Sequence, residues 1–227
     1  MRTLVFGDIH GCLGALDALL SATAPRQDDT VIFLGDYIDR GPYSADVLER
    51  LVQLKKQLKP IFLLGNHEQM LLGSRSNPLL HREWIANGGD MTLRSYGNIN
   101  CTLKDIPAEH WDLLGSLSLY HETGTHIFVH AGVEPLLPMD RQPTHALLWE
   151  RFADRPPQHL SGKTFICGHT PGRTVRNHGH AICIDTGVFK HNGLLTCLEI
   201  GTSRMYQANQ KGKVKTDRLP PVIPSGV

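Results

Sequence analysis

Apolar runs of four or five residues recur along the chain, and several are followed at once by glycine and charged residues. Near the N-terminus they lie at 3–6, 30–34 and 60–64. Apolar residues at consecutive positions are typical of a strand buried on both faces. Residues 12–24 and 44–58 instead repeat leucine and valine at helical spacing. The pattern predicts a strand–helix–strand–helix–strand unit with parallel strands and right-handed crossovers.

The pattern changes between residues 68 and about 117, where short apolar groups are spaced as in helices. We expect this segment to form a helical cap over the sheet. Strand-like runs then return at 126–130, 163–167, 180–185 and 193–200. The residues from 207 to 227 are rich in lysine and proline and predict a flexible tail. A single domain is therefore expected to span residues 1–206.

Composition narrows the class of protein. Lys and Arg number 23 against 22 Asp and Glu, so the formal charge of +1 gives no bias toward nucleic acid or membrane surfaces. The five cysteines are odd in number and form no C-x-x-C pair, which favours reduced thiols. No signal peptide and no apolar run of about 20 residues is present. We expect a cytoplasmic monomer that binds neither nucleic acid nor membranes.

Five polar motifs each follow an apolar, strand-like run. They are GDIHG (7–11), GDYIDRG (35–41), GNHE (65–68), HAG (130–132) and GHT (168–170). In open α/β sheets, ligands bind in the crevice beyond the carboxyl ends of the strands. The five loops are therefore expected to meet at one edge of the sheet.

The side chains in these motifs offer oxygen and nitrogen donors and no thiolate. The candidate ligands are Asp8, His10, Asp36, Asn66, His130 and His169. Such a set suits divalent Mn, Fe or Zn and not a structural cysteine–zinc site. Six ligands are too many for one ion with an open position, whereas two ions that share a carboxylate use them all. Each motif alone is also compatible with an ordinary turn, with Glu68 favouring a helix dipole, but five in order favour a metal site.

Taken together, the five motifs resemble the calcineurin-like metallophosphoesterases. The likeness is to their Ser/Thr protein phosphatase branch, as in bacteriophage lambda protein phosphatase and its small bacterial relatives. It runs from about residue 4 to residue 200 and includes ANGG (86–89), a Trp-x-Arg at 149–151 and DTG (185–187). The resemblance implies an α/β fold in which a β-sandwich with a βαβαβ core is flanked by helices and carries a helical cap.

The resemblance also implies a role for each matching residue. Two divalent ions, with Mn²⁺ favoured over Fe or Zn, would share the Asp36 carboxylate and acidify a water for in-line attack on phosphorus. The other ligands would be Asp8, His10 and His169 for the first ion, and Asn66 and His130 for the second.

Four further residues would act on the substrate in this interpretation. His67 would protonate the leaving alkoxide, and Asp39 would hydrogen-bond the His67 ring and favour its charged form. Arg40 would bind the phosphate oxygens through two parallel N–H groups. Arg151 would supply a second phosphate contact.

Three hypotheses follow. We favour a Ser/Thr protein phosphatase that acts on phosphorylated proteins or peptides. The alternative is a dinucleoside polyphosphate (diadenosine tetraphosphate) hydrolase with the same metal centre, which HAGVEP and DTG resemble as much; Asp39 and the short chain speak for the phosphatase. The third is an inactive binding module, against which the intact ligands and His67 argue. Asp185 is left open between a role beside the ligands and a turn aspartate.

Overall fold

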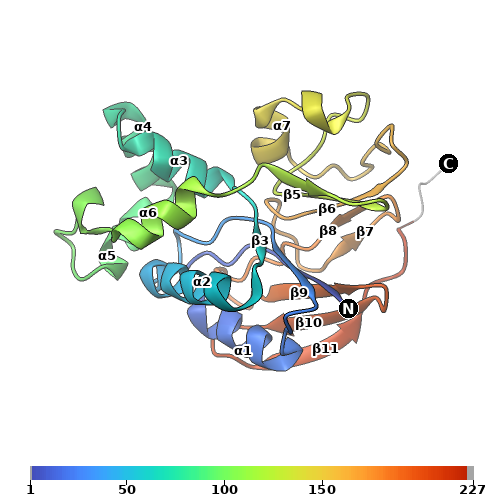
Figure 1. Cartoon of the computed structure of the whole chain (residues 1–227), viewed down its shortest axis with the longest axis horizontal. Coiled ribbons are helices and arrows are strands. Elements are labelled where there is room, and N and C mark those ends of the chain that lie inside the picture. The colour runs from blue at the N-terminus through green and yellow to red at the C-terminus, as the bar shows by residue number, and fades with distance from the viewer. Residues whose placement is uncertain (1, 224–227) are drawn as a thin grey trace.

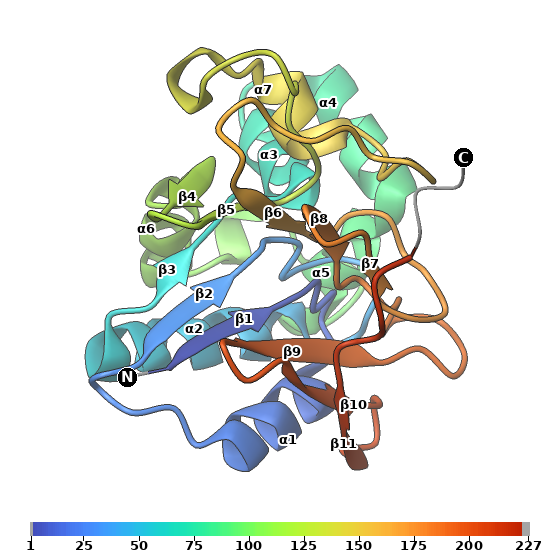
Figure 2. The same ribbon diagram turned by 90° about the vertical axis from the view of Figure 1, so that its right-hand side faces the viewer.

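Two β-sheets lie face to face, with helices on their outer sides, in a computed structural model that describes residues 2–223 (Figures 1 and 2). The first sheet has the strand order β11-β10-β9-β1-β2-β3. Its strands are β1 (Thr3–Phe6), β2 (Thr30–Phe33), β3 (Ile61–Phe62), β9 (Leu195–Ile200), β10 (Arg204–Ala208) and β11 (Val214–Arg218). Strands β1, β2 and β3 pair in parallel, as the alternating pattern predicts, and β9 joins β1 antiparallel.

The second sheet has the order β4-β5-β6-β8-β7. Its strands are β4 (Tyr120–Glu122), β5 (His126–Val129), β6 (Thr164–Cys167), β7 (Arg176–Asn177) and β8 (Ala181–Cys183). The three central strands are parallel and both edge strands are antiparallel. The predicted fold class, an α/β sandwich of sheets flanked by helices, is confirmed.

Alternate residues of β1 face different layers, because successive side chains in a strand point to opposite sides. Val5 packs between the two sheets with apolar side chains such as Phe128 and Ile166. Leu4 and Phe6 point the other way, against helices α1 (Leu13–Thr23) and α2 (Ser44–Leu58). Burial of each such side chain contributes about 1.5–3 kcal/mol, so β1 is held firmly from both faces.

The segment predicted to be helical consists of short helices beside α2 (Figure 1). They are α3 (Asn66–Ser74), α4 (Pro78–Trp84), a π-helical turn (Ile85–Gly89), α5 (Asp90–Ser95), a 3₁₀ turn (Leu103–Asp105) and α6 (Ala108–Gly115). Buried side chains such as Leu71 and Trp84 join the same core as α2. On the second sheet, a 3₁₀ turn (Met139–Arg141) precedes α7 (Thr144–Trp149), whose Leu147 and Leu148 cover the outer face.

The predicted flexible tail from residue 207 is wrong as far as residue 218. Strand β11 pairs antiparallel with β10, from Arg204 opposite Arg218 to Ala208 opposite Val214. Its side chains are mostly exposed at the edge of the sheet, so it carries no apolar alternation that would reveal a strand. Residues 224–227 of the predicted tail lie outside the described residues.

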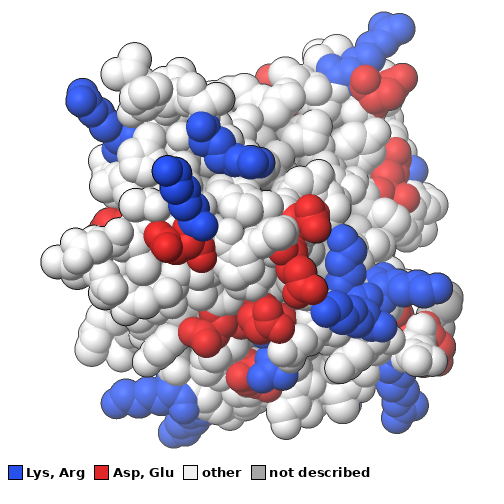
Figure 3. Space-filling model, turned by 60° about the vertical axis from the view of Figure 1, so that its left-hand side comes forward, with Lys and Arg blue, Asp and Glu red and all other residues white. Residues whose placement is uncertain are grey.

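The surface of the molecule shows no dominant charge on the face drawn in Figure 3, where basic and acidic side chains lie interspersed. This matches the formal charge of +1. Among the described residues, 2–223, no helix has the length and apolar content to cross a membrane.

Candidate active site

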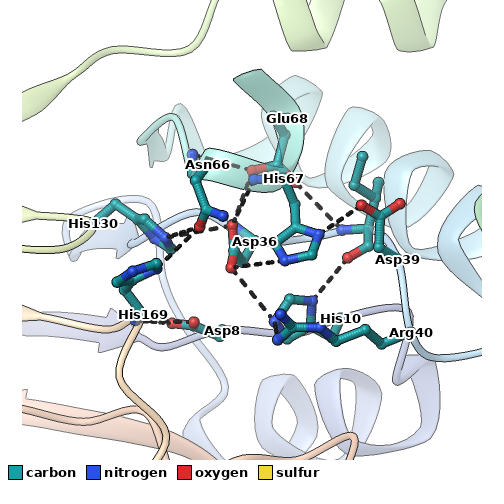
Figure 4. Close-up of polar contacts among 12 residues, drawn as sticks. Asp8, His10, Asp36, Asp39, Arg40, Asn66, His67, Glu68, His130 and His169 are labelled. Atoms are coloured by element: carbon teal, nitrogen blue, oxygen red, sulfur yellow. Dashed lines mark hydrogen bonds and ion pairs between the residues drawn. The ribbon is translucent and has the colours of Figure 1, made fainter. Parts of the chain in front are cut away.

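The polar loops that follow five strands bring their side chains together in one place, beyond the carboxyl ends of these strands (Figure 4). Three of them follow β1, β2 and β3 of the first sheet, and two follow β5 and β6 of the second. The expectation of a single sheet edge is therefore corrected: the loops come from two sheets. The residues brought together and buried are Asp8, His10, Asp36, Asp39, Asn66, His67, His130 and His169.

Asp36 lies at the centre of this group. Its Oδ1 is 3.4 Å from Nε2 of His130, and its Oδ2 is 3.4 Å from Nε2 of His10 and 4.0 Å from Nε2 of His67. Burial opposes ionisation of this carboxyl, but the surrounding imidazoles, His130 first, lower its pKa overall. One carboxylate thus faces two separate sets of nitrogen donors.

Asn66 and Asp8 add oxygen donors near His130 and His169. The side-chain oxygen of Asn66 lies 3.0 Å from both Nε2 of His130 and Nδ1 of His169. The Asp8 carboxylate accepts the backbone N–H of His169 at 3.0 and 3.2 Å. Burial, followed by the nearby Asp185 carboxylate, raises the pKa of Asp8. A cation at this position would relieve that repulsion.

Three histidines each use one ring nitrogen on a backbone carbonyl and turn the other into the site. This arrangement is characteristic of metal-binding histidines, since the outer hydrogen bond sets the tautomer and the ring orientation. The outer contacts are His10 Nδ1 to Ile38 O at 2.9 Å, His130 Nδ1 to Leu34 O at 2.9 Å and His169 Nε2 to Trp149 O at 3.2 Å.

Burial favours the neutral form of the same three rings, which is the form that binds a metal. Burial lowers the pKa of His10 and of His130, and it lowers the pKa of His169 to about 3. Donor atoms gather in two groups, and within each group they all lie within 4.8 Å of one another: His10, Asp36 and His67 form one group, and Asp36, His130 and His169 form the other. Because Asp36 belongs to both groups, the donors fit two metal ions that share one carboxylate.

The backbone at the site is held in an unusual conformation. Five of the nine non-glycine residues with positive φ in the described part of the chain lie here: His10, Asp36, Asp39, Arg40 and His169. Such residues cost about 1–3 kcal/mol each and persist where the surroundings hold them. Glycines supply part of that support, because a Cβ on Gly65 would collide with the Asp36 carboxylate and one on Gly168 with that of Asp8.

Asp39 and His67 form a buried pair. Nδ1 of His67 lies 2.6 Å from Oδ2 of Asp39, so the other ring nitrogen faces the metal ligands. Burial alone would lower the pKa of His67, but the carboxylates of Asp36 and Asp39 raise it overall. The arrangement can therefore hold a proton at Nε2 close to Asp36.

Arg40 and Arg151 differ in how closely they approach the site. A guanidinium nitrogen of Arg40 donates to Nε2 of His10 at 2.9 Å, and the guanidinium carbon lies 4.5 Å from the centre of the Phe189 ring. Arg151 is exposed and donates to the backbone oxygen of His169 at 3.2 Å. Both cations thus border the cluster, with Arg40 in direct contact.

Glu68 is a site residue whose part the sequence analysis missed. It is fully buried, and its carboxylate accepts backbone N–H groups of the GDYIDRG loop and of the GNHE turn. The capping pattern at the start of α3 was the available signal, but it does not reveal the contacts with the loop after β2. Phe189, which packs on His10 and Arg40, was also missed, as were Trp84 and Thr92, which donate to the Asp39 carboxylate.

The role of Asp185 was left open by the sequence, and this residue is both a turn aspartate and a neighbour of the ligand Asp8. It is buried and its Oδ1 accepts the backbone N–H of Gly187 at 2.9 Å, as a turn aspartate does. Burial raises its pKa to about 6, and its charge acts on Asp8.

A family model described as calcineurin-like phosphoesterase matches residues 1–195. The chain belongs to this family. Its members use a binuclear metal centre, and the donor groups that share Asp36 are the part of this phosphoesterase that fits one.

Relatives of this phosphoesterase are named for different activities. It is 30% identical to the serine/threonine-protein phosphatase 1 of Salmonella typhimurium, over 86% of this chain and 90% of the relative. It is 26% identical to the asymmetrical bis(5'-nucleosyl)-tetraphosphatase PrpE of Oceanobacillus iheyensis, over 86% and 87%. The crystal structure of a cold-active protein-tyrosine phosphatase from a psychrophilic Shewanella species shares the fold, with a TM-score of 0.69, 20% identity, and 95% and 80% coverage.

Proposed function

We propose that this phosphoesterase hydrolyses phosphate monoesters on serine and threonine side chains of proteins. The observation that carries the proposal is the buried contact of 2.6 Å between His67 and Asp39 beside Asp36. An alkoxide is a poor leaving group, so its departure benefits from a positioned proton donor. The similarity to a serine/threonine-protein phosphatase over most of both chains supports the same substrate class.

In this proposal the residues of the chain hold the metal ions, orient the phosphate and protonate the leaving oxygen. The ions, for which we favour Mn²⁺, would be held by Asp8, His10, Asp36, Asn66, His130 and His169. When bound, two divalent cations lower the pKa of coordinated water and offset charge on the phosphate.

The remaining residues would act on the ester. Arg40, stacked on Phe189, would offer two N–H groups to the phosphate oxygens, and Arg151 would add a contact from the rim. His67 would give the proton at Nε2 to the leaving oxygen, while Asp39 accepts the hydrogen bond at Nδ1 and keeps the ring in place.

The second candidate is hydrolysis of dinucleoside polyphosphates, which the similarity to PrpE favours. The departing group in that reaction is itself a phosphate ester of low basicity, so it has less need of a proton donor. The pairing of His67 with Asp39 therefore favours hydrolysis of phosphate monoesters over hydrolysis of dinucleoside polyphosphates.

A metal-dependent activity panel tests the proposal. The purified protein with Mn²⁺ is assayed on a phosphoserine peptide, a phosphotyrosine peptide and diadenosine tetraphosphate, with Asp36→Asn as the inactive control. We expect kcat/KM to be highest for the phosphoserine peptide. A 100-fold preference for the dinucleotide would overturn the assignment.

A further inference from the structure

The carboxylate of Asp39 is surrounded by donors from the helical segment as well as by His67. Nε1 of Trp84 lies 3.0 Å from both carboxylate oxygens, and Oγ1 of Thr92 donates to Oδ1 at 2.6 Å. Asp39, Trp84 and Thr92 are each fully buried. Both oxygens are therefore engaged, and the plane of the carboxylate has no freedom to turn away from His67.

The two donors come from different helices, α4 and α5, on either side of the π-helical turn at Ile85–Gly89. This turn contains the ANGG motif, to which neither the metal site nor the proposed chemistry assigns a role. Gly88 has φ of 105°, and its carbonyl accepts the backbone N–H of Arg40 at 3.3 Å. A Cβ on Gly89 would collide with the indole of Trp84. The motif thus lets α4 and α5 close around Asp39 and Arg40 together.

Thr92 also bonds the backbone of Asp39. The N–H of Asp39 lies 2.9 Å from Oγ1 of Thr92 and 3.0 Å from Oγ of Ser44, the first residue of α2. Asp39 has φ of 70°, a conformation that non-glycine residues adopt only where neighbours hold it. One hydroxyl therefore supports both the strained backbone and the side chain of Asp39.

We infer that Trp84 and Thr92 are positioning residues for proton delivery, holding the Asp39 carboxylate so that His67 directs Nε2 at the leaving oxygen of the substrate. The inference rests on the proposed role of His67. Neither residue touches the metal ligands in the described contacts, so losing either donor should change proton delivery more than metal binding. The signature is a loss that grows as the leaving group becomes a stronger base.

The test compares two substitutions at one position. Thr92→Val keeps the shape of the side chain and removes its donor, whereas Thr92→Ser keeps the hydroxyl. Turnover is measured on phenyl phosphate and on p-nitrophenyl phosphate, whose leaving group needs no proton. For Thr92→Val we expect kcat to fall about tenfold on phenyl phosphate and less than about twofold on p-nitrophenyl phosphate, with KM unchanged and activity restored in Thr92→Ser.

Two controls separate positioning from general damage. Thr23→Val removes another buried hydroxyl, which bonds Leu19 O at 2.7 Å within α1, and should leave both substrates unaffected. Trp84→Phe should repeat the leaving-group pattern of Thr92→Val while metal content is retained. Equal losses on both substrates, or a Thr92→Ser enzyme as impaired as Thr92→Val, would overturn the inference.

A spectroscopic readout does not depend on the substrate class. In the ¹⁵N-labelled protein, the short contact of His67 with Asp39 should give a low-field Nδ1–H proton resonance that shifts in Thr92→Val and returns in Thr92→Ser. An unchanged resonance in Thr92→Val would also overturn the inference. A wild-type protein that hydrolyses aryl phosphates but no phosphoserine peptide would refute the proposed function alone. The aryl phosphate comparison and the His67 resonance would still test the roles of Trp84 and Thr92.

Discussion

The Glu68 carboxylate accepts the backbone N–H of Asp36 at 2.9 Å, so the helix after β3 holds the loop after β2. The same carboxylate accepts the N–H groups of Tyr37 at 2.8 Å, Ile38 at 3.3 Å and Gly65 at 3.1 Å. Four donors therefore converge on one buried side chain. Asp36 has a positive φ, and this contact is one of those that hold the central ligand in that strained position, together with the N–H groups of Ile9 and His10 that its carbonyl accepts.

Glu68→Gln is expected to lower the free energy of unfolding by at least about 2 kcal/mol. The new amide group would point its own N–H at backbone donors and leave buried groups unsatisfied. Urea denaturation measures the change, with Glu109→Gln, exposed on α6, as the matched control. If both variants unfolded at the same urea concentration as the wild type, the supporting role of Glu68 would be refuted.

Asp36→Asn is expected to lower the affinity for both metal ions, because Asp36 alone belongs to both donor groups. Asn66→Ala should mainly loosen the ion held by Asn66 and His130 and leave the other ion bound. Metal analysis of the purified proteins distinguishes the two outcomes. Two ions per chain in Asp36→Asn would contradict a shared carboxylate.

His67→Asn is expected to lower kcat for phosphoserine by about 100-fold or more while the metal content stays at the wild-type value. The loss should be smaller for p-nitrophenyl phosphate, whose leaving group needs no proton. The matched variant is His110→Asn, because His110 is buried in α6 and bonds Tyr96 at 2.8 Å outside the site. A proton-donor role is wrong if both substrates slow equally.

Asp29→Asn is expected to affect stability in a pH-dependent way. Hydrogen bonds from Arg2, one of them 2.6 Å long, lower the pKa of Asp29 below its ordinary value. A carboxyl with a depressed pKa stabilises the fold above the unfolded pKa of about 3.9, and that contribution is lost as pH falls further. The variant should therefore be less stable by about 1–3 kcal/mol at neutral pH, with the difference shrinking below about pH 4.

Denaturation at neutral and acid pH measures this difference. Asp112→Asn, at an exposed position, is the control and should follow the wild type at both. A deficit of Asp29→Asn that is the same at about pH 7 and about pH 3 would show that the charge of Asp29 is not its source.

The strands and ligands could be predicted because their signals are local in the sequence. An apolar run followed by glycine and a charged residue marks both the strand and the point where its loop begins. His130 and His169 carry a related signal in the second sheet, since each histidine lies next to or near a glycine directly after an apolar run. The assignment of loops to two sheets could not be predicted in this way, because all five strands carry similar apolar runs.

The support of the site could not be predicted from local pattern. Trp84 and Thr92 lie 45 and 53 residues from Asp39, and their spacing in short helices is that of ordinary core residues. Strand β11 could not be predicted for a different reason. Its pairing with β10 is made by backbone hydrogen bonds, and its exposed lysine and arginine are what an unprotected sheet edge carries.

The pairing of β1 with β9 has a consequence for how the molecule is made. Thr3 lies opposite Ile200, so the strand that leads into Asp8 and His10 gains its second neighbour only after almost the whole chain exists. Contacts this distant in sequence are slow to form, since a long loop must close first. On the ribosome the N-terminal strand would wait beside β2 with one side unpaired. Shielding this half-finished sheet from other chains is then a requirement of biosynthesis rather than of catalysis.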